Sequence, residues 1–323
     1  MRILITGAGG AAAISVWKSL GADHELHMAD MDPLATGLYL VPAAQRLIIP
    51  RGDDPRLLDV LHDACKARRI EALLPTVDTE LFPVAAAHAR FDAISVALPI
   101  SPAACLRICR DKQLLMDTVK GAVPTPESEP LTQAVADRVT SFPRLAKPRS
   151  GAGSRGVNKI NSREHLEDMP KDGSFLLQEF LPGEEYSVDV YVRREGRVIA
   201  AVPRERMKID SGIAVVSRTI NLPEVIESAT RTAELIGIRG TANVQFKRAA
   251  DGILKLLEVN PRYPGTLPLT AAAGVDLPKL MADELMGRPV PDSLMPFKEL
   301  MVVRYWTEHY FDAGEWKALC RPQ

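Results

Sequence analysis

Cysteine and histidine are scarce in this sequence, and their spacing argues against a structural zinc site. The 323 residues contain six histidines, none in an HxxxH or HExxH pattern. The cysteines form no CxxC pair; they are Cys65, Cys105, Cys109 and Cys320. We therefore expect buried, reduced thiols in a cytoplasmic protein and no structural zinc site.

Long apolar runs and an excess of charge of one sign are also absent. No stretch approaches the roughly 18 consecutive apolar residues that a membrane-spanning helix needs. Lys and Arg total 40 and Asp and Glu total 41, so the formal net charge is −1. Neither nucleic acid nor an anionic membrane is therefore expected as the main partner. With 46% hydrophobic and 25% charged residues the composition is that of a globular protein, and the length indicates two or three lobes.

Strand and helix signals alternate over the first hundred residues. Apolar runs predict strands at 2–6, 25–30, 46–49, 72–75 and 95–98. Helices are expected between them, at 11–20, 56–69 and 78–89. Such alternation predicts an α/β lobe whose parallel sheet is covered by helices on both faces.

A glycine turn follows the first expected strand and has some features of a dinucleotide-binding fingerprint. Gly7, Gly9 and Ala12 fit the pattern GxGxxG/A loosely, and Asp30 ends the second strand where a ribose-binding acid is needed. The rest of the chain offers no isolated His–Asp or Tyr–Lys pair for hydride transfer. This absence argues against an NAD-binding oxidoreductase, which stays open as an alternative because of the glycine turn and Asp30.

The order of elements changes in the second part of the chain. Residues 121–143 contain four prolines and little periodicity, so we interpret them as a connection between lobes. Beyond them strands are expected at 144–147, 157–160, 175–179, 186–193, 198–202, 214–219, 241–247 and 253–258, with a helix at 223–236. This order predicts an α+β fold rather than further βαβ units.

The segment KPRSGAGSRGV, residues 147–157, places a glycine-rich loop between two expected strands. It is not a Walker loop, because GxxxxGK[ST] is absent from the chain. Backbone N–H groups of such a loop can point at polyphosphate oxygens, since the glycines permit close approach. Lys147, at the end of the strand, can place its ammonium group on the same phosphates. A flexible hairpin tip is the alternative.

The segment LLQEFLPGEEY, residues 176–186, joins two expected strands through a short linker. The linker backbone can offer hydrogen-bonding groups to the edge of an adenine, with Phe180 and Leu181 as apolar walls. Glu185 can accept hydrogen bonds from ribose hydroxyls. Taken alone, a solvated turn explains this linker more simply.

The dipeptide Asp-Gly at 251–252 predicts a two-residue turn between the last two expected strands. Such a turn places Gln245 opposite Glu258 and Asn243 opposite Asn260, all on one face of the hairpin. The opposite face, directed to the core, is expected to carry Val244, Phe246, Leu257 and Val259. A shift of the register by one residue would destroy this arrangement.

The polar face of this hairpin has the donor set of a magnesium site. One carboxylate flanked by amide oxygens suits Mg²⁺, which prefers oxygen ligands and keeps phosphate oxygens in its shell. Arg262 follows the hairpin and can bind a phosphoryl or carboxylate group with two hydrogen bonds. A solvent-exposed polar hairpin also explains the alternation, but it explains less well why these residues precede the segment PRYPG, residues 261–265.

Taken in order, these segments resemble the motifs of the ATP-grasp superfamily, above all the ATP-binding halves of carbamoyl-phosphate synthase large subunits and related single-chain carboxylate–amine ligases. The resemblance includes Asp111-Lys112, KPRSGAGSRGV, QEFLPGEEYSVD and NVQF…LLEVNPR. It implies an α/β N-terminal lobe with a parallel sheet, residues 1–110, which in this family is not an NAD site. A two-lobed α+β ATP-grasp fold follows, with a lid lobe over 111–184 and a C-terminal lobe over 185–323.

The resemblance also implies roles for single residues. The phosphates, adenine and ribose of ATP would be bound by Lys112, Lys147, Ser150, Gly151, Ala152, Gly153, Ser154, Gly156, Glu179, Phe180, Leu181 and Glu185. Two Mg²⁺ ions, for which Mn²⁺ can substitute, would be held by Gln245, Glu258 and Asn260, with Glu258 bridging them. The catalytic residues would be Lys147 and Arg262, the latter stabilising the transferring phosphoryl group.

The implied reaction has two steps and needs no protein nucleophile. A carboxylate attacks the γ-phosphate of ATP to give an acyl phosphate and ADP, and an amine then displaces phosphate to form an amide or peptide bond. Because the chain holds one such half and no glutaminase, an organic or amino acid fits better than bicarbonate. The relatives suggest a homodimer, and a non-catalytic ATP-binding regulatory module is a second alternative.

The acceptor site is the least readable part of the sequence. Arg206 or Arg218 could hold a substrate carboxylate, although exposed basic residues on strands explain both equally well. Aromatic residues make up 5% of the chain, yet several gather near its end, at Tyr305, Trp306, Tyr310, Phe311 and Trp316. They could close the active site, form a dimer surface or cap the core.

Overall fold

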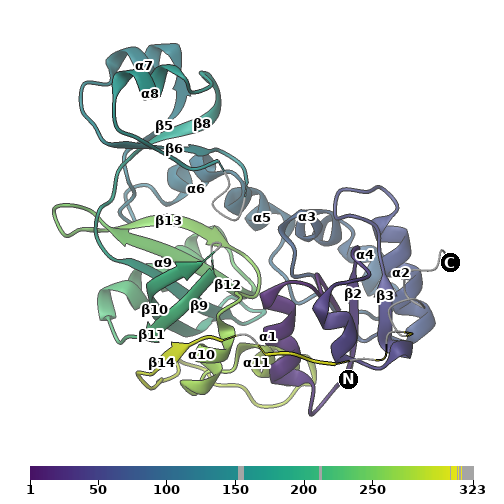
Figure 1. Cartoon of the computed structure of the whole chain (residues 1–323). Helices are drawn as coiled ribbons and strands as arrows, with labels where there is room; N and C mark the ends of the chain where they lie inside the picture. Colours follow the sequence, from purple (N-terminus) through teal and green to yellow (C-terminus); the bar gives the residue numbers. More distant parts are fainter. Residues whose placement is uncertain (152–155, 211–212, 306, 311, 313, 315–323) are drawn as a thin grey trace.

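The computed structural model describes residues 1–151, 156–210, 213–305, 307–310, 312 and 314, which form three lobes (Figure 1). Within these residues, each of the first two lobes contains a four-stranded sheet and the third contains a six-stranded sheet. In Figure 1 the second lobe, drawn in teal at the top, projects away from the N-terminal lobe and lies above the third sheet.

The N-terminal lobe is the predicted parallel α/β lobe. Its strands pair in the order β3-β2-β1-β4 and are β1 (Arg2–Thr6), β2 (Glu25–Asp30), β3 (Arg46–Ile48) and β4 (Ala72–Leu74). Its helices are α1 (Ala11–Leu20), η1 (Thr36–Leu40), η2 (Ala43–Gln45), α2 (Leu57–Arg68), α3 (Asp78–Ala86) and α4 (His88–Asp92). The prediction of a strand at 95–98 is wrong, because this segment forms only an isolated bridge, between Ala97 and Ala72.

Strand β1 is apolar along its whole length because both of its faces are covered. Ile3 and Ile5 pack in the same core cluster as Val16 of α1. Leu4, which points to the other face, packs in the cluster that contains Leu61 of α2. A continuous apolar run therefore marks a strand in the middle of a sheet with helices on both sides.

Two helices lead out of this lobe, α5 (Ala103–Arg110) and α6 (Lys112–Val119). Asp111 caps α6, since its Oδ1 atom accepts hydrogen bonds from the backbone N–H of Gln113 at 3.0 Å and of Leu114 at 3.2 Å. Leu115 and Met116 of α6 pack in the core beneath the six-stranded sheet. The first part of the segment predicted as the lid thus packs with the C-terminal lobe, and the limits of the lobes stay a prediction.

The lid lobe contains an antiparallel sheet in the order β5-β8-β6-β7. Its elements are β5 (Ser128–Thr132), α7 (Gln133–Arg138), β6 (Arg144–Pro148), β7 (Asn158–Ile160), α8 (Arg163–Glu167) and β8 (Asp172–Glu179). Residues 121–143, which the prolines indicated to be a connection between lobes, therefore contain β5 and α7. Pro130 is accommodated because β5 is an edge strand.

The C-terminal lobe contains an antiparallel sheet in the order β13-β12-β9-β10-β11-β14. Its elements are β9 (Glu185–Val192), β10 (Val198–Asp210), β11 (Ile213–Thr219), α9 (Pro223–Ile236), β12 (Gly240–Arg248), β13 (Leu254–Asn260), α10 (Leu267–Ala272), α11 (Leu277–Leu285) and β14 (Met301–Val303). On one face Val188 and Phe246 pack with Ala229 of α9. On the other face Tyr191 and Val202 belong to the cluster of the N-terminal lobe.

Two further expectations concern cysteine and the membrane. Cys65, Cys105 and Cys109 are buried free thiols, and Cys320 lies outside the described residues. In the part of the chain that the structure describes, no helix is long and apolar enough to cross a bilayer.

Candidate active site

A cavity of about 220 Å³ lies between the lid sheet and the six-stranded sheet. Residues from the lid, the linker after β8 and the two hairpin strands line it. Those that the sequence had singled out are Lys112, Lys147, Gly151, Glu179, Phe180, Leu181, Glu185, Gln245 and Glu258. Segments more than 100 residues apart in the chain therefore meet in one place, whereas the predicted site residues Ser150, Gly156, Asn260 and Arg262 are not among those that line the cavity.

Two of the lysines that line the cavity, Lys112 and Lys147, are buried and form no ion pair within the described residues. Lys112 Nζ donates a hydrogen bond to the Gly151 carbonyl oxygen at 2.8 Å, and Lys147 Nζ donates one to the Leu257 carbonyl oxygen at 3.2 Å. Neither forms an ion pair with a carboxylate of the described residues. Burial lowers the pKa of Lys147 to about 8, the charge of Glu258 raises it, and the charge of Lys112 lowers it further. Two buried cations that form no ion pair make this wall of the cavity suitable for an anion.

The glycine-rich loop is only partly described. Gly151 and Gly156 have φ angles of 146° and 73°, values that side chains rarely tolerate. Ser150, which precedes them, is exposed and forms an isolated bridge with Asp111. The predicted phosphate-binding residues Ala152, Gly153 and Ser154 lie outside the described residues.

The linker after β8 is held in place by its own side chains. The Glu179 carboxylate accepts hydrogen bonds from Lys255 Nζ at 2.7 and 2.9 Å, so its charge is used within the protein. Lys159 Nζ lies 4.3 Å from the centre of the Phe180 ring, and Leu181 is buried. The backbone of the linker, rather than the Glu179 side chain, is thus the part left for recognition of a ligand.

One of the two arginines predicted to bind substrate lies beside the cavity, and the other does not. Arg206 Nε lies 3.0 Å from Glu185 Oε1, so the acid predicted to bind ribose already has a cationic partner. Arg218 pairs across the strands with Glu205, and its Nε donates to Glu205 Oε2 at 2.8 Å. Because successive residues of a strand point to opposite faces, Glu205 and Arg218 lie on the face opposite Arg206. The structure does not bring Arg218 to the site.

The hairpin has the predicted register at its polar residues, but its turn is different. Asn243 pairs with Asn260 and Gln245 with Glu258. The chain does not reverse through a two-residue turn, because Ala249 N–H donates to the Ile253 carbonyl oxygen at 2.9 Å across a longer loop. An irregularity next to Gln245 compensates for the longer loop and restores the register.

This irregularity also changes which leucine enters the core. Phe246 pairs with Leu256, which is fully buried, whereas Leu257 lines the cavity. The prediction that Leu257 faces the core is therefore wrong, while Val244 and Val259 do face it. A bulge of this kind leaves no signal in the apolar pattern, because both positions are leucine.

The polar face of the hairpin fits a divalent cation that prefers oxygen. Asn260 Nδ2 donates to Glu258 Oε1 at 3.1 Å, and Gln245 Nε2 donates to Asn243 Oδ1 at 3.2 Å. Within the described residues, no group of three or more His, Cys, Asp or Glu side chains is arranged so that it could hold a metal ion. One carboxylate with amide oxygens suits Mg²⁺, which takes its remaining ligands from water and phosphate, better than a metal that needs a full protein cage.

Arg262 joins the hairpin to the N-terminal lobe. Its Nε and terminal nitrogen donate to the two oxygens of Asp78 at 2.8 and 3.0 Å. Asp78 begins α3 at the carboxyl end of the parallel sheet. This bidentate pair holds the guanidinium group in one orientation beside the end of β13.

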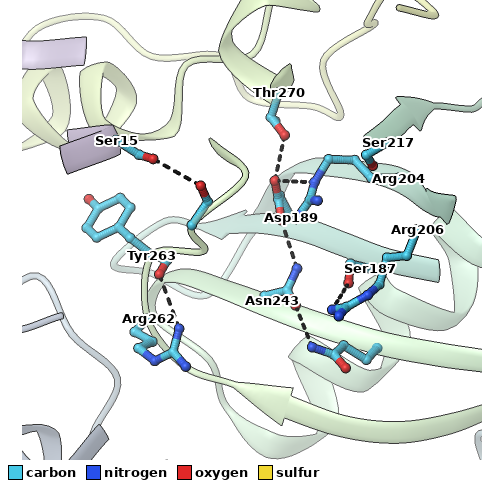
Figure 2. A network of polar contacts seen from close by, with 12 residues as sticks. Ser15, Ser187, Asp189, Arg204, Arg206, Ser217, Asn243, Arg262, Tyr263 and Thr270 are labelled. Atoms are coloured by element: carbon cyan, nitrogen blue, oxygen red, sulfur yellow. Dashed lines mark hydrogen bonds and ion pairs between the residues drawn. The ribbon is translucent and has the colours of Figure 1, made fainter. Parts of the chain in front are cut away.

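A buried polar network, which the sequence did not reveal, supports the hairpin from the neighbouring strands (Figure 2). Asp189 Oδ2 accepts from Arg204 Nε at 2.8 Å and from Thr270 Oγ1 at 2.5 Å. Asp189 Oδ1 accepts from the Arg204 terminal nitrogen at 2.7 Å and from Asn243 Nδ2 at 2.8 Å. The only signal was the single acid within the otherwise apolar run VDVYV of β9.

The glycine turn after β1 uses its polar groups internally. Gly9 N–H donates to Asp30 Oδ2 at 2.8 Å, and Asp32 N–H donates to Asp30 Oδ1 at 3.0 Å. Both oxygens of the acid predicted to hold a ribose are therefore engaged by the backbone. The NAD-binding alternative gains no support from this geometry.

Comparison with known families now accounts for the arrangement. Residues 171–309 match a family described as ATP-grasp in the biosynthetic pathway with Ter operon, and residues 3–99 match the PylC-like N-terminal domain. The matched part of the chain, residues 171–309, is an ATP-grasp domain. The predicted resemblance to the ATP-grasp superfamily and the predicted fold class are thereby confirmed.

Individual ATP-grasp proteins are similar over most of the chain. A carbamoyl phosphate synthase large chain from Thermomicrobium roseum is 26% identical over 293 residues, which are 81% of this chain and 27% of that protein. Biotin carboxylase from Campylobacter jejuni has a TM-score of 0.72 at 16% identity, over 90% of this chain and 72% of that one. An L-amino acid ligase from Bacillus licheniformis has a TM-score of 0.68 at 17% identity, over 88% and 74%. The chain thus spans about a quarter of the synthase that it resembles.

Proposed function

We propose that this ATP-grasp protein is an ATP- and Mg²⁺-dependent ligase that activates a carboxylate as an acyl phosphate and couples it to an amine, releasing ADP and phosphate. The observation that carries the proposal is the cavity in which Lys112 and Lys147, buried and without an acidic partner, lie with Glu258. A metal–triphosphate ligand requires two features: cations without a counter-ion for its phosphates, and a carboxylate with neighbouring amide oxygens for its metal.

The proposed ligand extends along the sheet from the linker to the end of the hairpin. Adenine would lie against Phe180 and Leu181 and bond with the linker backbone, and Glu185 would accept from the ribose. The phosphates would contact Lys112, Lys147 and the loop residues Ser150, Gly151, Ala152, Gly153, Ser154 and Gly156. Mg²⁺, two ions with Mn²⁺ as a substitute, would be held by Gln245, Glu258 and Asn260 and would neutralise charge on the phosphate oxygens.

The chain's own residues position the reacting groups rather than form a covalent bond. Lys147 would stabilise charge on the phosphates, with an ammonium group that burial has already desolvated. Arg262, held by Asp78, would meet the phosphoryl group without having to search for its orientation. The lid sheet would exclude water from the acyl phosphate, which water would otherwise hydrolyse.

The names of the reported relatives support a ligase and leave its substrates open. They are a carbamoyl phosphate synthase, a biotin carboxylase and an L-amino acid ligase. We infer a small-molecule acid, organic or amino acid, and a small-molecule amine as substrates. A cytoplasmic homodimer is part of the same proposal.

The test is product analysis with pooled substrates. Purified protein is incubated with Mg-ATP and pools of carboxylic acids and amines, and ADP, AMP, phosphate and new masses are resolved. We expect ADP and phosphate to form only with particular pools. AMP with pyrophosphate would contradict the proposal, and tight ATP binding without turnover in any pool would favour the regulatory module.

The matched variants separate the metal site from general damage. Glu258→Ala is expected to lower ADP formation about 100-fold or more while the protein stays folded. Glu184→Ala is the control, because Glu184 is exposed and does not line the cavity. Near-normal turnover of a folded Glu258→Ala protein would remove Glu258 from the metal site.

A further inference from the structure

Arg304, just beyond the edge strand β14, reaches from the six-stranded sheet to the loop that follows the hairpin. Its backbone N–H donates to the Val215 carbonyl oxygen at 2.9 Å, which fixes the residue to β11. Its terminal nitrogen donates to the Gly265 carbonyl oxygen at 2.6 Å, and Ser15 Oγ of α1 donates to the same oxygen at 3.2 Å. The guanidinium group therefore lies where the C-terminal lobe meets the N-terminal lobe.

Arg304 has no ion-pair partner among the described residues. Its guanidinium group is partly buried, and within the described residues no carboxylate lies within ion-pair distance of it. Burial lowers its pKa, and the charge of Arg204 lowers it further, so a second cation is close by. By contrast Arg204 pairs with Asp189, Arg206 with Glu185, and Arg262 with Asp78.

Asp189, the acid that pairs with Arg204, is already fully engaged. Each oxygen of Asp189 already accepts two hydrogen bonds, two of the four from Arg204 and the others from Asn243 and Thr270 (Figure 2). Asp189 balances one guanidinium charge, and Arg204 and Arg304 carry two. One positive charge is left over in a partly desolvated place, which is an unfavourable state unless an anion enters.

The position along the sheet indicates which part of a substrate this anion belongs to. Glu185 and Lys247 pair at the end of the sheet near the linker, Gln245 and Glu258 pair further along, and Asn260 ends β13. Gly265 follows beyond that end and packs closely against Ala11 of α1. A Cβ atom added at Gly265 would lie only 2.9 Å from the Ala11 Cβ. The proposed adenine, phosphate and metal positions therefore come first, and Arg304 lies past them, on the side that they leave to the phosphoryl acceptor.

We propose that Arg304 binds a carboxylate group of the acid substrate and thereby determines the preference of the enzyme for anionic acids. This inference rests on the proposed function, because it takes the ligand beyond the metal residues to be the acceptor acid. The planar guanidinium group can bind a carboxylate with two hydrogen bonds while one nitrogen keeps its bond to Gly265. Arg304 is thus a recognition residue and takes no part in the transfer itself.

The test uses Arg304→Gln, because the glutamine amide can still donate a hydrogen bond to the Gly265 carbonyl oxygen but carries no charge. With an acid found by the pool assay, KM for that acid is expected to rise about 10- to 150-fold, the range of a lost charge-assisted bond. KM for ATP is expected to stay within about twofold of the parent value. Arg304→Lys is expected to lie between the two, since lysine keeps the charge and loses the planar fork. A merely structural role predicts no change of KM for the acid in Arg304→Gln.

A second measurement uses no turnover. The melting temperature is recorded with Mg-ADP and sodium acetate or sodium succinate, against sodium chloride at equal ionic strength. The parent protein and the control Arg231→Gln, an exposed position on α9, are expected to be stabilised by a carboxylate, and Arg304→Gln is not. Equal stabilisation of all proteins, or of none, would overturn the inference. ADP formation with an unchanged KM for the acid in Arg304→Gln would overturn the inference about Arg304 and leave the proposed ligase function intact. Stabilisation by a carboxylate that needs Arg304, without ADP formation in any pool, would support the inference about Arg304 and contradict the ligase function.

Discussion

Glu80 is a carboxylic acid enclosed within the N-terminal lobe, and its burial makes a measurable prediction about stability. The side chain belongs to the first turn of α3 and the residue is 4% exposed. It accepts a hydrogen bond from Thr6 Oγ1 at the end of β1. Burial raises the pKa of Glu80 to about 7, the bond from Thr6 opposes this rise, and the charge of Asp30 adds to it.

The sign of the effect follows from proton linkage. The folded protein binds the proton of Glu80 more tightly than the unfolded chain, for which the ordinary pKa is 4.5. The stability that this group contributes is therefore fully present below pH 4.5 and is lost as the pH rises through about 7. At 1.36 kcal/mol for each pKa unit, the difference between 4.5 and 7 corresponds to about 3 kcal/mol.

The perturbation that isolates this effect is Glu80→Gln, which keeps the shape of the side chain and stays neutral at every pH. The free energy of unfolding in urea is measured for the parent and the variant between pH 4.5 and pH 8. We expect the variant to gain about 3 kcal/mol relative to the parent across this range, because only the parent has to bury a charge. All other titrating groups are common to both proteins and cancel in the difference.

The control is Glu227→Gln, at an exposed position on α9. The difference in the free energy of unfolding between this control and the parent is expected to stay constant with pH within about 0.5 kcal/mol. If the profile of Glu80→Gln runs parallel to that of the parent, the pKa of Glu80 is the same in the folded and the unfolded protein, and the reasoning from its burial is refuted.

Two further predictions concern buried charges in the other lobes. Lys147→Met is expected to lower ADP formation by about 100-fold or more without lowering the free energy of unfolding in urea, because a buried cation without a carboxylate partner is replaced by an apolar chain; a marked loss of stability would show that Lys147 is mainly structural. Asp189→Asn is expected to cost about 3–5 kcal/mol in the same unfolding assay, since Arg204 is left buried without its counter-ion; a cost below about 1 kcal/mol would contradict this.

Local patterns were sufficient for most elements of the N-terminal lobe and for the face of the hairpin. The strands at 2–6 and 25–30 and the helices at 11–20 and 223–236 have the predicted bounds. Apolar period and glycine position depend on neighbouring residues alone, so they can be read without the fold. Where the signal was weak, at 95–98 and at 121–143, the prediction was wrong, because pairing with distant strands decides whether a short segment becomes part of a sheet.

The candidate site was predictable where a motif is continuous in the chain and not where it depends on packing. The sequence placed Lys147, Glu258 and the linker in one site because their order and spacing are those of a known family. It could not show that Arg218 lies on the wrong face, since that depends on the pairing of β10 with β11. Nor could it show that the backbone N–H of Gly9, in the glycine turn of the first lobe, donates its hydrogen bond to Asp30.

By itself the sequence determined the type of each lobe and the set of chemical groups available, because composition and alternation act between near neighbours. The tertiary structure alone decided which charges are left without a partner. Arg262 meets Asp78 from another lobe, Asp189 is filled by Arg204, Asn243 and Thr270, and Arg304 finds a carbonyl oxygen but no acid among the described residues. Ion pairs form between side chains that packing brings within a few ångströms, whatever their separation in the chain, so cations without an acidic partner can be identified only after the chain has folded.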